Sequence, residues 1–243
     1  MSYFLSNQKL HVNQSLELDG EEARHILLSR RMKVGEQIVL QEAGGKRFLC
    51  EFVSATKRSL SLQTISEIEI PKELPTKMYL FQSIVSEKAL DFIFQKATEL
   101  GAAGILLFNS QNTPVKLSTD QFISKSERWN KILWEAAKQC DRGQIPELLF
   151  YPNLTELLKE AGKVDNIFIL DASGSNLKSS ILNLKSASAM ALAVGPEGGF
   201  TELELEQLQS LPNSTTISIS PFTLRAETAA IAGLAAAENI IFI

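Results

Sequence analysis

Two stretches decide the fold: Val194-Gly195-Pro196-Glu197-Gly198-Gly199-Phe200, and Ile219-Ser220-Pro221-Phe222-Thr223-Leu224-Arg225-Ala226-Glu227-Thr228-Ala229-Ala230. Each follows a β-branched or apolar run, passes through a turn rich in Gly or Pro, and enters a helical pattern. Units of this kind place their loops at the carboxyl ends of neighbouring strands, where α/β sheets bind ligands. The two stretches therefore predict a ligand crevice.

Working outward, apolar runs and amphipathic patterns alternate from residue 77 to the end. The expected strands cover residues 78–84, 104–108, 147–151, 167–170, 189–194 and 215–219. The expected helices cover residues 86–100, 126–140, 154–161, 201–211 and 225–239. Strands that are apolar throughout predict a mostly parallel sheet with helices on both faces.

The first 70 residues have a different pattern. Short alternating runs at 37–40, 47–53 and 59–65 predict strands, with a hairpin turn at 42–46 and one helix over 21–28. Several short strands and one helix indicate a small barrel. Pro71 and Pro75 then mark a linker. We therefore expect domains at 1–70 and 77–243, joined by residues 71–76.

Composition narrows the class of protein. The net charge of −4 makes an RNA-binding surface a local patch at most. Arg24, Arg30, Arg31 and Lys33 lie close together and form either such a phosphate-contacting face or an ordinary solvated surface. The cysteines, Cys50 and Cys140, are far apart and lack metal-binding spacing, which predicts free thiols and no metal site. We expect a soluble cytoplasmic protein.

The first of the two stretches differs from a phosphate-binding loop. No Lys-Ser or Lys-Thr pair follows its glycines, and Thr201 with Glu204 forms a capping box that opens a helix. Glu197 lies inside the loop, and Glu202, Glu204 and Glu206 crowd the first turns of the helix. These carboxylates favour a neutral or cationic ligand over phosphate. The alternative is a tight structural turn.

The second stretch carries a cation at a helix start. Arg225 opposes the helix dipole there, which favours a functional role, although Arg225 and Glu227 could also form a capping pair. The helix that follows is rich in Ala and Gly and suits close packing against a pocket or a subunit. A third loop, Leu170-Asp171-Ala172-Ser173-Gly174, also ends a predicted strand and could join the same crevice.

Two further motifs complete a set of four in order. They are Lys96-Ala97-Thr98-Glu99-Leu100-Gly101, and Trp129 followed by Glu135-Ala136-Ala137-Lys138-Gln139-Cys140-Asp141-Arg142 and Ile145-Pro146. With the GPEGGF and LRAETA stretches, the sequence resembles the SPOUT-class 16S ribosomal RNA (uracil-N3)-methyltransferases over nearly its whole length. In place of the Gly and Arg that commonly precede LRxETA in that family, this chain has Ser220 and Phe222.

The resemblance implies an N-terminal PUA-like barrel that helps to bind RNA. It also implies a C-terminal α/β domain with a deep trefoil knot, which ordinary threading rules would not predict. The family binds S-adenosylmethionine at the knot, works as a homodimer, and methylates N3 of one uridine of 16S rRNA near the decoding region of the small subunit. Rival hypotheses are a SPOUT enzyme acting on another RNA, such as tRNA, and a non-catalytic RNA-binding module.

The expected site residues fall into three groups. A cation beside the uracil oxygens would stabilise the anion left when N3 loses its proton, and Arg225 or Arg142 could supply it. Glu227 could act as the base or orient Arg225. The expected cofactor-binding residues are Leu170, Asp171, Ala172, Val194, Gly195, Pro196, Glu197, Gly198, Gly199, Ile219, Ser220, Pro221, Phe222, Leu224 and Thr228. The expected RNA-binding residues are Arg24, Arg30, Arg31, Lys33 and Arg142.

Overall fold

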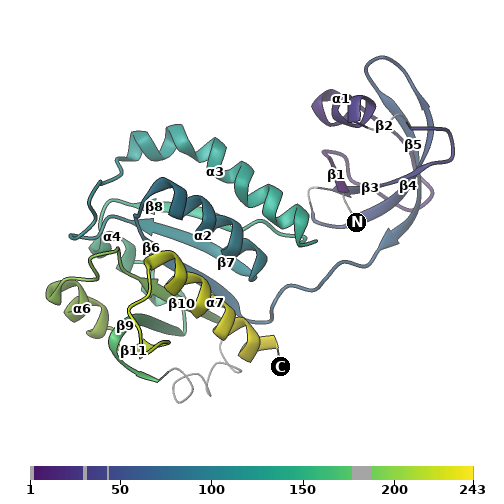
Figure 1. The fold of residues 1–243 in the computed structure, drawn as a ribbon. Coiled ribbons are helices and arrows are strands. Elements are labelled where there is room, and N and C mark those ends of the chain that lie inside the picture. Colours follow the sequence, from purple (N-terminus) through teal and green to yellow (C-terminus); the bar gives the residue numbers. More distant parts are fainter. Residues whose placement is uncertain (1–2, 30–31, 43, 177–187, 243) are drawn as a thin grey trace. The chain divides into compact units, whose positions relative to one another are not determined.

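The computed structural model describes residues 3–29, 32–42, 44–176 and 188–242 (Figure 1). The chain divides into a first unit, Met1–Lys72 with Lys138–Gln144, and a second unit, Glu73–Ala137 with Ile145–Ile243. The expectation of two contiguous domains missed residues 138–144. This segment joins the first unit because the buried Arg47 side chain donates to its backbone, a contact that sequence spacing does not reveal.

The first unit is a five-stranded sheet with one helix. Its elements are β1 (Tyr3–Ser6), β2 (Ser15–Leu18), α1 (Gly20–Ser29), β3 (Gln37–Glu42), β4 (Arg47–Ala55) and β5 (Leu60–Ile68). The strand order is β1-β3-β4-β5-β2, and only the β1–β3 pair is parallel. The helix and the three expected strands are confirmed. The strands β1 and β2, of four residues each, were not predicted.

The second unit is built on a six-stranded parallel sheet. Its strands are β6 (Lys77–Ser83), β7 (Ala102–Phe108), β8 (Glu147–Tyr151), β9 (Asn166–Asn176), β10 (Ala189–Val194) and β11 (Ser214–Ser218). They lie in the order β11-β9-β10-β6-β7-β8, and every pair is parallel. Every residue of β10 is buried, as expected for a central strand covered on both faces.

Helices cover both faces of this sheet (Figure 1). The helices are α2 (Glu87–Glu99), α3 (Thr119–Gln139), α4 (Leu154–Leu158), α6 (Glu202–Gln209) and α7 (Ala226–Phe242), with a short 3₁₀ turn at Ala161–Lys163. Leu80 and Leu192 face α2, α3 and α7, whereas Phe81 and Ala193 face α4 and α6. The α3 helix begins at Thr119, before the expected residue 126. The prediction missed its first turns because they are largely exposed and lack a helical period of apolar residues.

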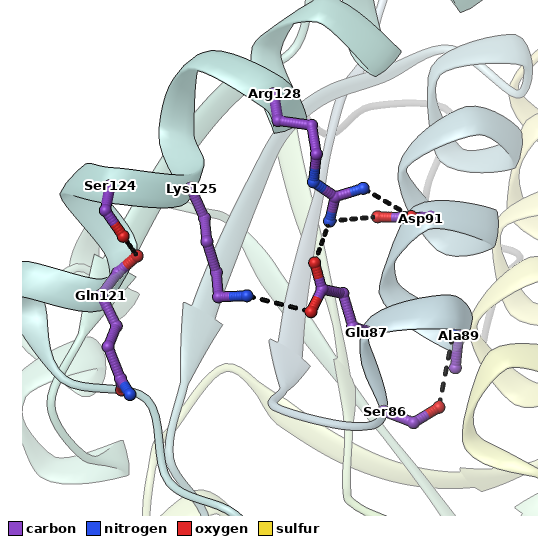
Figure 2. A network of polar contacts seen from close by, with 8 residues as sticks. All are labelled: Ser86, Glu87, Ala89, Asp91, Gln121, Ser124, Lys125 and Arg128. Carbon is purple, nitrogen blue, oxygen red and sulfur yellow. Dashed lines mark hydrogen bonds and ion pairs between the residues drawn. The ribbon is translucent and has the colours of Figure 1, made fainter.

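Exposed ion pairs join α2 to α3 (Figure 2). Arg128 donates through both terminal nitrogens to Asp91, at 2.8 and 3.0 Å, and also to Glu87. Lys125 donates to the other oxygen of Glu87 at 2.9 Å, and this hydrogen bond lowers the pKa of the Glu87 carboxyl. Such surface pairs contribute less than about 1 kcal/mol each, so buried contacts such as Phe94 on Trp129 dominate the packing of these helices.

Several small residues of α7 pack in the core of the second unit. Ala230 and Ala237 are buried where α7 packs on α2 and β10. A Cβ added at Gly233 would lie 2.9 Å from Leu170 Cδ1, so a larger residue there would require the Leu170 side chain to shift. Internal packing therefore accounts for much of the small-residue pattern. Among the residues that the structure describes, no helix combines the length and hydropathy needed to span a membrane.

Candidate functional site

The carboxyl ends of β10 and β11 and residues 170–172 of β9 open onto one pocket. The expectation of a strand end at Leu170 followed by a loop over residues 171–174 was wrong, because these residues continue β9 to Asn176. Leu170 of β9 pairs with Val194 of β10, and β11 pairs with the other edge of β9. The pocket has a volume of about 330 Å³, in the range of small-molecule sites. Its lining residues are Leu170, Asp171, Ala172, Val194, Gly195, Pro196, Glu197, Gly198, Gly199, Phe200, Ile217, Ser218, Ile219, Ser220, Phe222, Thr223, Leu224, Ala226 and Ala229.

All the residues expected to bind a cofactor line this pocket except Pro221 and Thr228. Six lining residues were not among the expected cofactor-binding residues: Phe200, Ile217, Ser218, Thr223, Ala226 and Ala229. No lysine or arginine is among the lining residues in the described part of the chain. Glu197 and Asp171 are the carboxylates of the lining, so the pocket suits a ligand without phosphate groups.

The glycines of residues 195–200, here called the Gly loop, have structural reasons to be glycine. A Cβ added at Gly195 would lie 3.1 Å from the Phe200 nitrogen, tighter than ordinary contact. Gly199 has a φ of +70°, and its N–H donates to the Pro196 carbonyl at 2.9 Å. The Phe200 ring stacks on Phe108 with centroids 6.4 Å apart. The loop therefore folds back tightly on itself before α6 begins.

The expected capping box at the start of α6 is confirmed. The Thr201 hydroxyl accepts from the Glu204 N–H at 3.3 Å, and the Glu204 carboxylate accepts from the Thr201 N–H at 3.0 Å. The expectation that the glutamates after the loop shape the electrostatics of the ligand site needs correction. The Glu204 side chain is buried and its carboxylate is hydrogen-bonded. Glu202 and Glu206 are exposed and do not line the pocket. Glu197 alone of these four residues lines the pocket.

A polar segment after β7 supports the Gly loop and was missed in the sequence. The Asn112 side-chain amide donates to the Gly198 and Gly199 carbonyls at 3.3 and 3.1 Å. The Glu204 carboxylate accepts from the Ser110 hydroxyl at 3.0 Å and from the Gln111 N–H at 2.9 Å. A signal was present, because a polar run directly follows the apolar strand. The order of strands, which brings this segment to the Gly loop, is not readable from the pattern.

The wall formed by residues 219–225, here called the Arg loop, is more exposed. The Phe222 N–H donates to the Ser220 hydroxyl at 3.0 Å, and the Phe222 ring is 78% exposed. Arg225 is exposed at the start of α7, and its carbonyl accepts the Ala229 N–H at 2.8 Å. Within the described residues Arg225 forms no ion pair, so the alternative of an Arg225–Glu227 capping pair finds no support there. Arg225, Glu227 and Thr228 lie next to the lining residues but not among them.

The third wall, formed by residues 170–172 of β9, is followed by a close backbone approach between β9 and β11. A Cβ added at Gly174 would lie 2.5 Å from the Ile217 carbonyl carbon, so β9 and β11 could not pass each other with any side chain there. The Asp171 carboxylate accepts from the Ser173 N–H at 2.9 Å and from its hydroxyl at 2.6 Å. These contacts hold Asp171 at the pocket without a charged partner among the described residues.

The basic residues of the first unit differ in exposure. Arg24 and Lys33 are exposed, and Arg30 and Arg31 lie outside the described residues. Arg142 is 8% exposed, which corrects the expectation of a surface phosphate contact, and it is not among the residues that line the pocket. Its carbonyl accepts from Arg47 at 2.8 Å, and Arg47 also lies 3.9 Å over the Tyr3 ring. The buried Arg47 side chain thus binds the backbone of residues 141 and 142.

Comparison with known proteins matches both units to family models. Residues 72–238 match the family model described as an RNA methyltransferase domain, and residues 18–65 match an RNA methyltransferase PUA domain. The chain is 31% identical to the ribosomal RNA small subunit methyltransferase E of Bacillus subtilis, over 96% of this chain and 93% of that protein. It is 32% identical to the protein of the same name from Aquifex aeolicus, over 91% of this chain and 96% of that protein.

Solved structures agree with this assignment. A ribosomal RNA small subunit methyltransferase E of Neisseria gonorrhoeae, bound to S-adenosylmethionine, superposes with a TM-score of 0.84 at 26% identity, covering 98% of this chain and 97% of that one. A protein of Legionella pneumophila with bound SAM gives a TM-score of 0.83 at 29% identity, covering 98% of this chain and 96% of that one. The chain belongs to the ribosomal RNA small subunit methyltransferase E family.

Proposed function

We propose that this protein transfers a methyl group from S-adenosylmethionine to N3 of a uridine in the 16S rRNA of the small ribosomal subunit, near the decoding region. The observation that carries the proposal is the convergence of the loops after β10 and β11 and residues 170–172 of β9 on one pocket, in a chain of this family. Two relatives of similar fold were solved with this cofactor bound.

The pocket fits the proposed cofactor in size and charge. S-adenosylmethionine is a sulfonium cation without phosphate, and the lining offers Glu197 and Asp171 with no lysine or arginine among the described residues. Leu170, Phe222 and Leu224 supply apolar surface for an adenine ring. The Gly loop and Ile219 would hold the rest of the ligand by backbone contact. Pro221 and Thr228 flank the lining and would act through the shape of the Arg loop. When bound, the cofactor supplies an electrophilic methyl group.

The chain's own residues would prepare the uridine. N3 is a poor nucleophile until its proton leaves, and the negative charge then spreads over the uracil oxygens. Arg225 is exposed at the pocket edge without an ion-pair partner in the described residues, so its guanidinium is available to stabilise that charge. Glu227, two residues further along α7, would orient Arg225 or accept the proton. Catalysis would then consist of positioning and charge stabilisation.

Other parts of the proposal rest on the same family membership. The first unit would help to bind RNA, with Arg24, Arg30, Arg31 and Lys33 as the candidate contacts. The protein would act as a homodimer through α7 and the Gly loop side of the second unit, where Ala232, Ala235 and Ala236 remain partly exposed. The sheet would carry a trefoil knot. A ribosomal substrate would place the protein in the cytoplasm.

A methyl-transfer assay tests the function directly. Small subunits from a strain lacking the gene would be incubated with the protein and labelled cofactor, and the modified nucleotide mapped by primer extension, which N3 methylation blocks. We expect label in 16S rRNA at one uridine, and none in subunits from the parent strain. Label in a parallel reaction on tRNA, with none in 16S rRNA, would support action on another RNA. Cofactor binding without transfer to any RNA would indicate a non-catalytic module.

A further inference from the structure

The segment that follows β7 makes two separate contacts, one with the start of α6 and one with the Gly loop. At the first, the buried carboxylate of Glu204 collects four hydrogen bonds. They come from the Gln111 N–H at 2.9 Å, the Ser110 hydroxyl at 3.0 Å, the Thr201 N–H at 3.0 Å and the Thr201 hydroxyl at 3.1 Å. A buried carboxylate with this many donors ties the segment firmly to the start of α6.

At the second point, the contact reaches the pocket wall itself. The Asn112 Nδ2 group donates to the carbonyls of Gly198 and Gly199, both of which line the pocket. Asn112 Cβ lies 3.3 Å from the position that a Cβ on Gly198 would occupy, so the two backbones approach closely. Asn112 does not line the pocket, and its side chain is exposed. It therefore contributes little to the core.

We propose that Asn112 is a positioning residue for the cofactor, because its side-chain amide holds the two glycine carbonyls and so fixes the Gly loop in the conformation that forms the pocket wall. The inference rests on the proposed function, since it takes the pocket to be the S-adenosylmethionine site. The adjacent Glu204 contact fixes the base of the segment, which leaves Asn112 as the group that acts on the loop.

The test uses Asn112→Asp in the full-length protein. The substitution keeps the size of the side chain but replaces the N–H₂ donor by a carboxylate oxygen, which repels the two carbonyl oxygens instead of binding them. We expect the Kd for S-adenosylmethionine, measured by calorimetry, to rise about tenfold, and a smaller rise of about threefold for Asn112→Ala, which only removes the bonds. The kcat at saturating cofactor is expected to stay within twofold of wild type.

Asn130→Asp is the matched control. Asn130 is exposed on α3, and its Nδ2 group donates to a carbonyl, Ser126 O, at 2.9 Å, so the chemical change is the same away from the pocket. Its Kd should equal that of wild type, and both variants should keep the thermal midpoint of the ligand-free protein. Equal cofactor affinity of wild type and Asn112→Asp would overturn the inference alone. A wild-type protein that binds no S-adenosylmethionine would overturn the proposed function and the inference with it.

Discussion

The two principal walls of the pocket are held in different ways. The Gly loop is bounded by the buried strand β10 and by a capped helix, and Asn112 binds it from a neighbouring segment. The Arg loop has bonds within itself, such as Phe222 N–H to Ser220, and leaves both Phe222 and Arg225 exposed. One wall is thus fixed before any ligand arrives, whereas the other presents a ring and a cation to the solvent.

This difference indicates a division of labour. A preorganised wall loses little conformational entropy on binding and suits a small cofactor that is always the same. An exposed loop that carries a cation suits a large substrate that must be approached from outside and whose charge develops only during reaction. Changes in the Gly loop and its supports should therefore alter cofactor affinity, whereas loss of the exposed Arg225 cation should alter turnover.

The sharpest test of this division is Arg225→Ala. Removing a cation that stabilises charge only in the transition state should lower kcat by about 100-fold or more, with the Kd for S-adenosylmethionine within about threefold of wild type. Single-turnover methylation of small subunits gives the first value and calorimetry the second. Arg128→Ala, on the α2–α3 surface of Figure 2, is the matched loss of an exposed arginine and should leave both unchanged. Wild-type turnover of Arg225→Ala would remove Arg225 from the mechanism.

The fixed wall is tested through its buried support, Glu204→Gln. Glutamine keeps the shape but places an N–H₂ group among donors from Ser110, Gln111 and Thr201, leaving at least one of them unsatisfied. We expect a loss of about 1–3 kcal/mol in the free energy of unfolding, and about a tenfold rise in the Kd for the cofactor. Chemical denaturation and calorimetry measure these.

The control for this variant is Glu202→Gln, in the same first turn of α6 but exposed. It should change the free energy of unfolding by less than about 0.5 kcal/mol. If Glu204→Gln lowers stability while cofactor affinity is unchanged, the Gly loop holds its shape without this support, and the contrast between the walls rests on the loop's own glycines.

Much of the fold could be predicted because the relevant signals are local. The apolar run of β10 and the Thr201–Glu204 capping box depend on residues a few positions apart, and the structure has both. What could not be predicted depends on distant partners. Arg47 donates to the carbonyls of Asp141 and Arg142, which lie in the first unit. The backbone of β9 at Gly174 contacts that of Ile217. Neither contact can be inferred from the spacing of residues in the sequence.

The candidate site follows the same rule. The loops after β10 and β11 each carry a turn signal, so their residues could be proposed one stretch at a time, whereas the turn signal at residues 171–174 falls inside β9. The contribution of Asn112 requires β7 and β10 to be near one another in the sheet, which is a property of strand order. For Glu204, the residue type suggested charge at the pocket, and burial against Ser110 and Gln111 reversed that interpretation.

The smallest expected effect belongs to Phe222→Ala. Its ring is 78% exposed, so truncation should alter the free energy of unfolding by less than about 0.5 kcal/mol. If the ring covers the adenine, the Kd for S-adenosylmethionine should rise about fivefold, or about 1 kcal/mol, as for loss of one aromatic contact. Phe92→Ala, which removes a 47% exposed ring from α2, is the control and should leave the Kd unchanged. A raised KM for small subunits with unaltered cofactor affinity would instead assign Phe222 to the RNA, which would place the whole Arg loop on the substrate side and make the contrast between the walls complete.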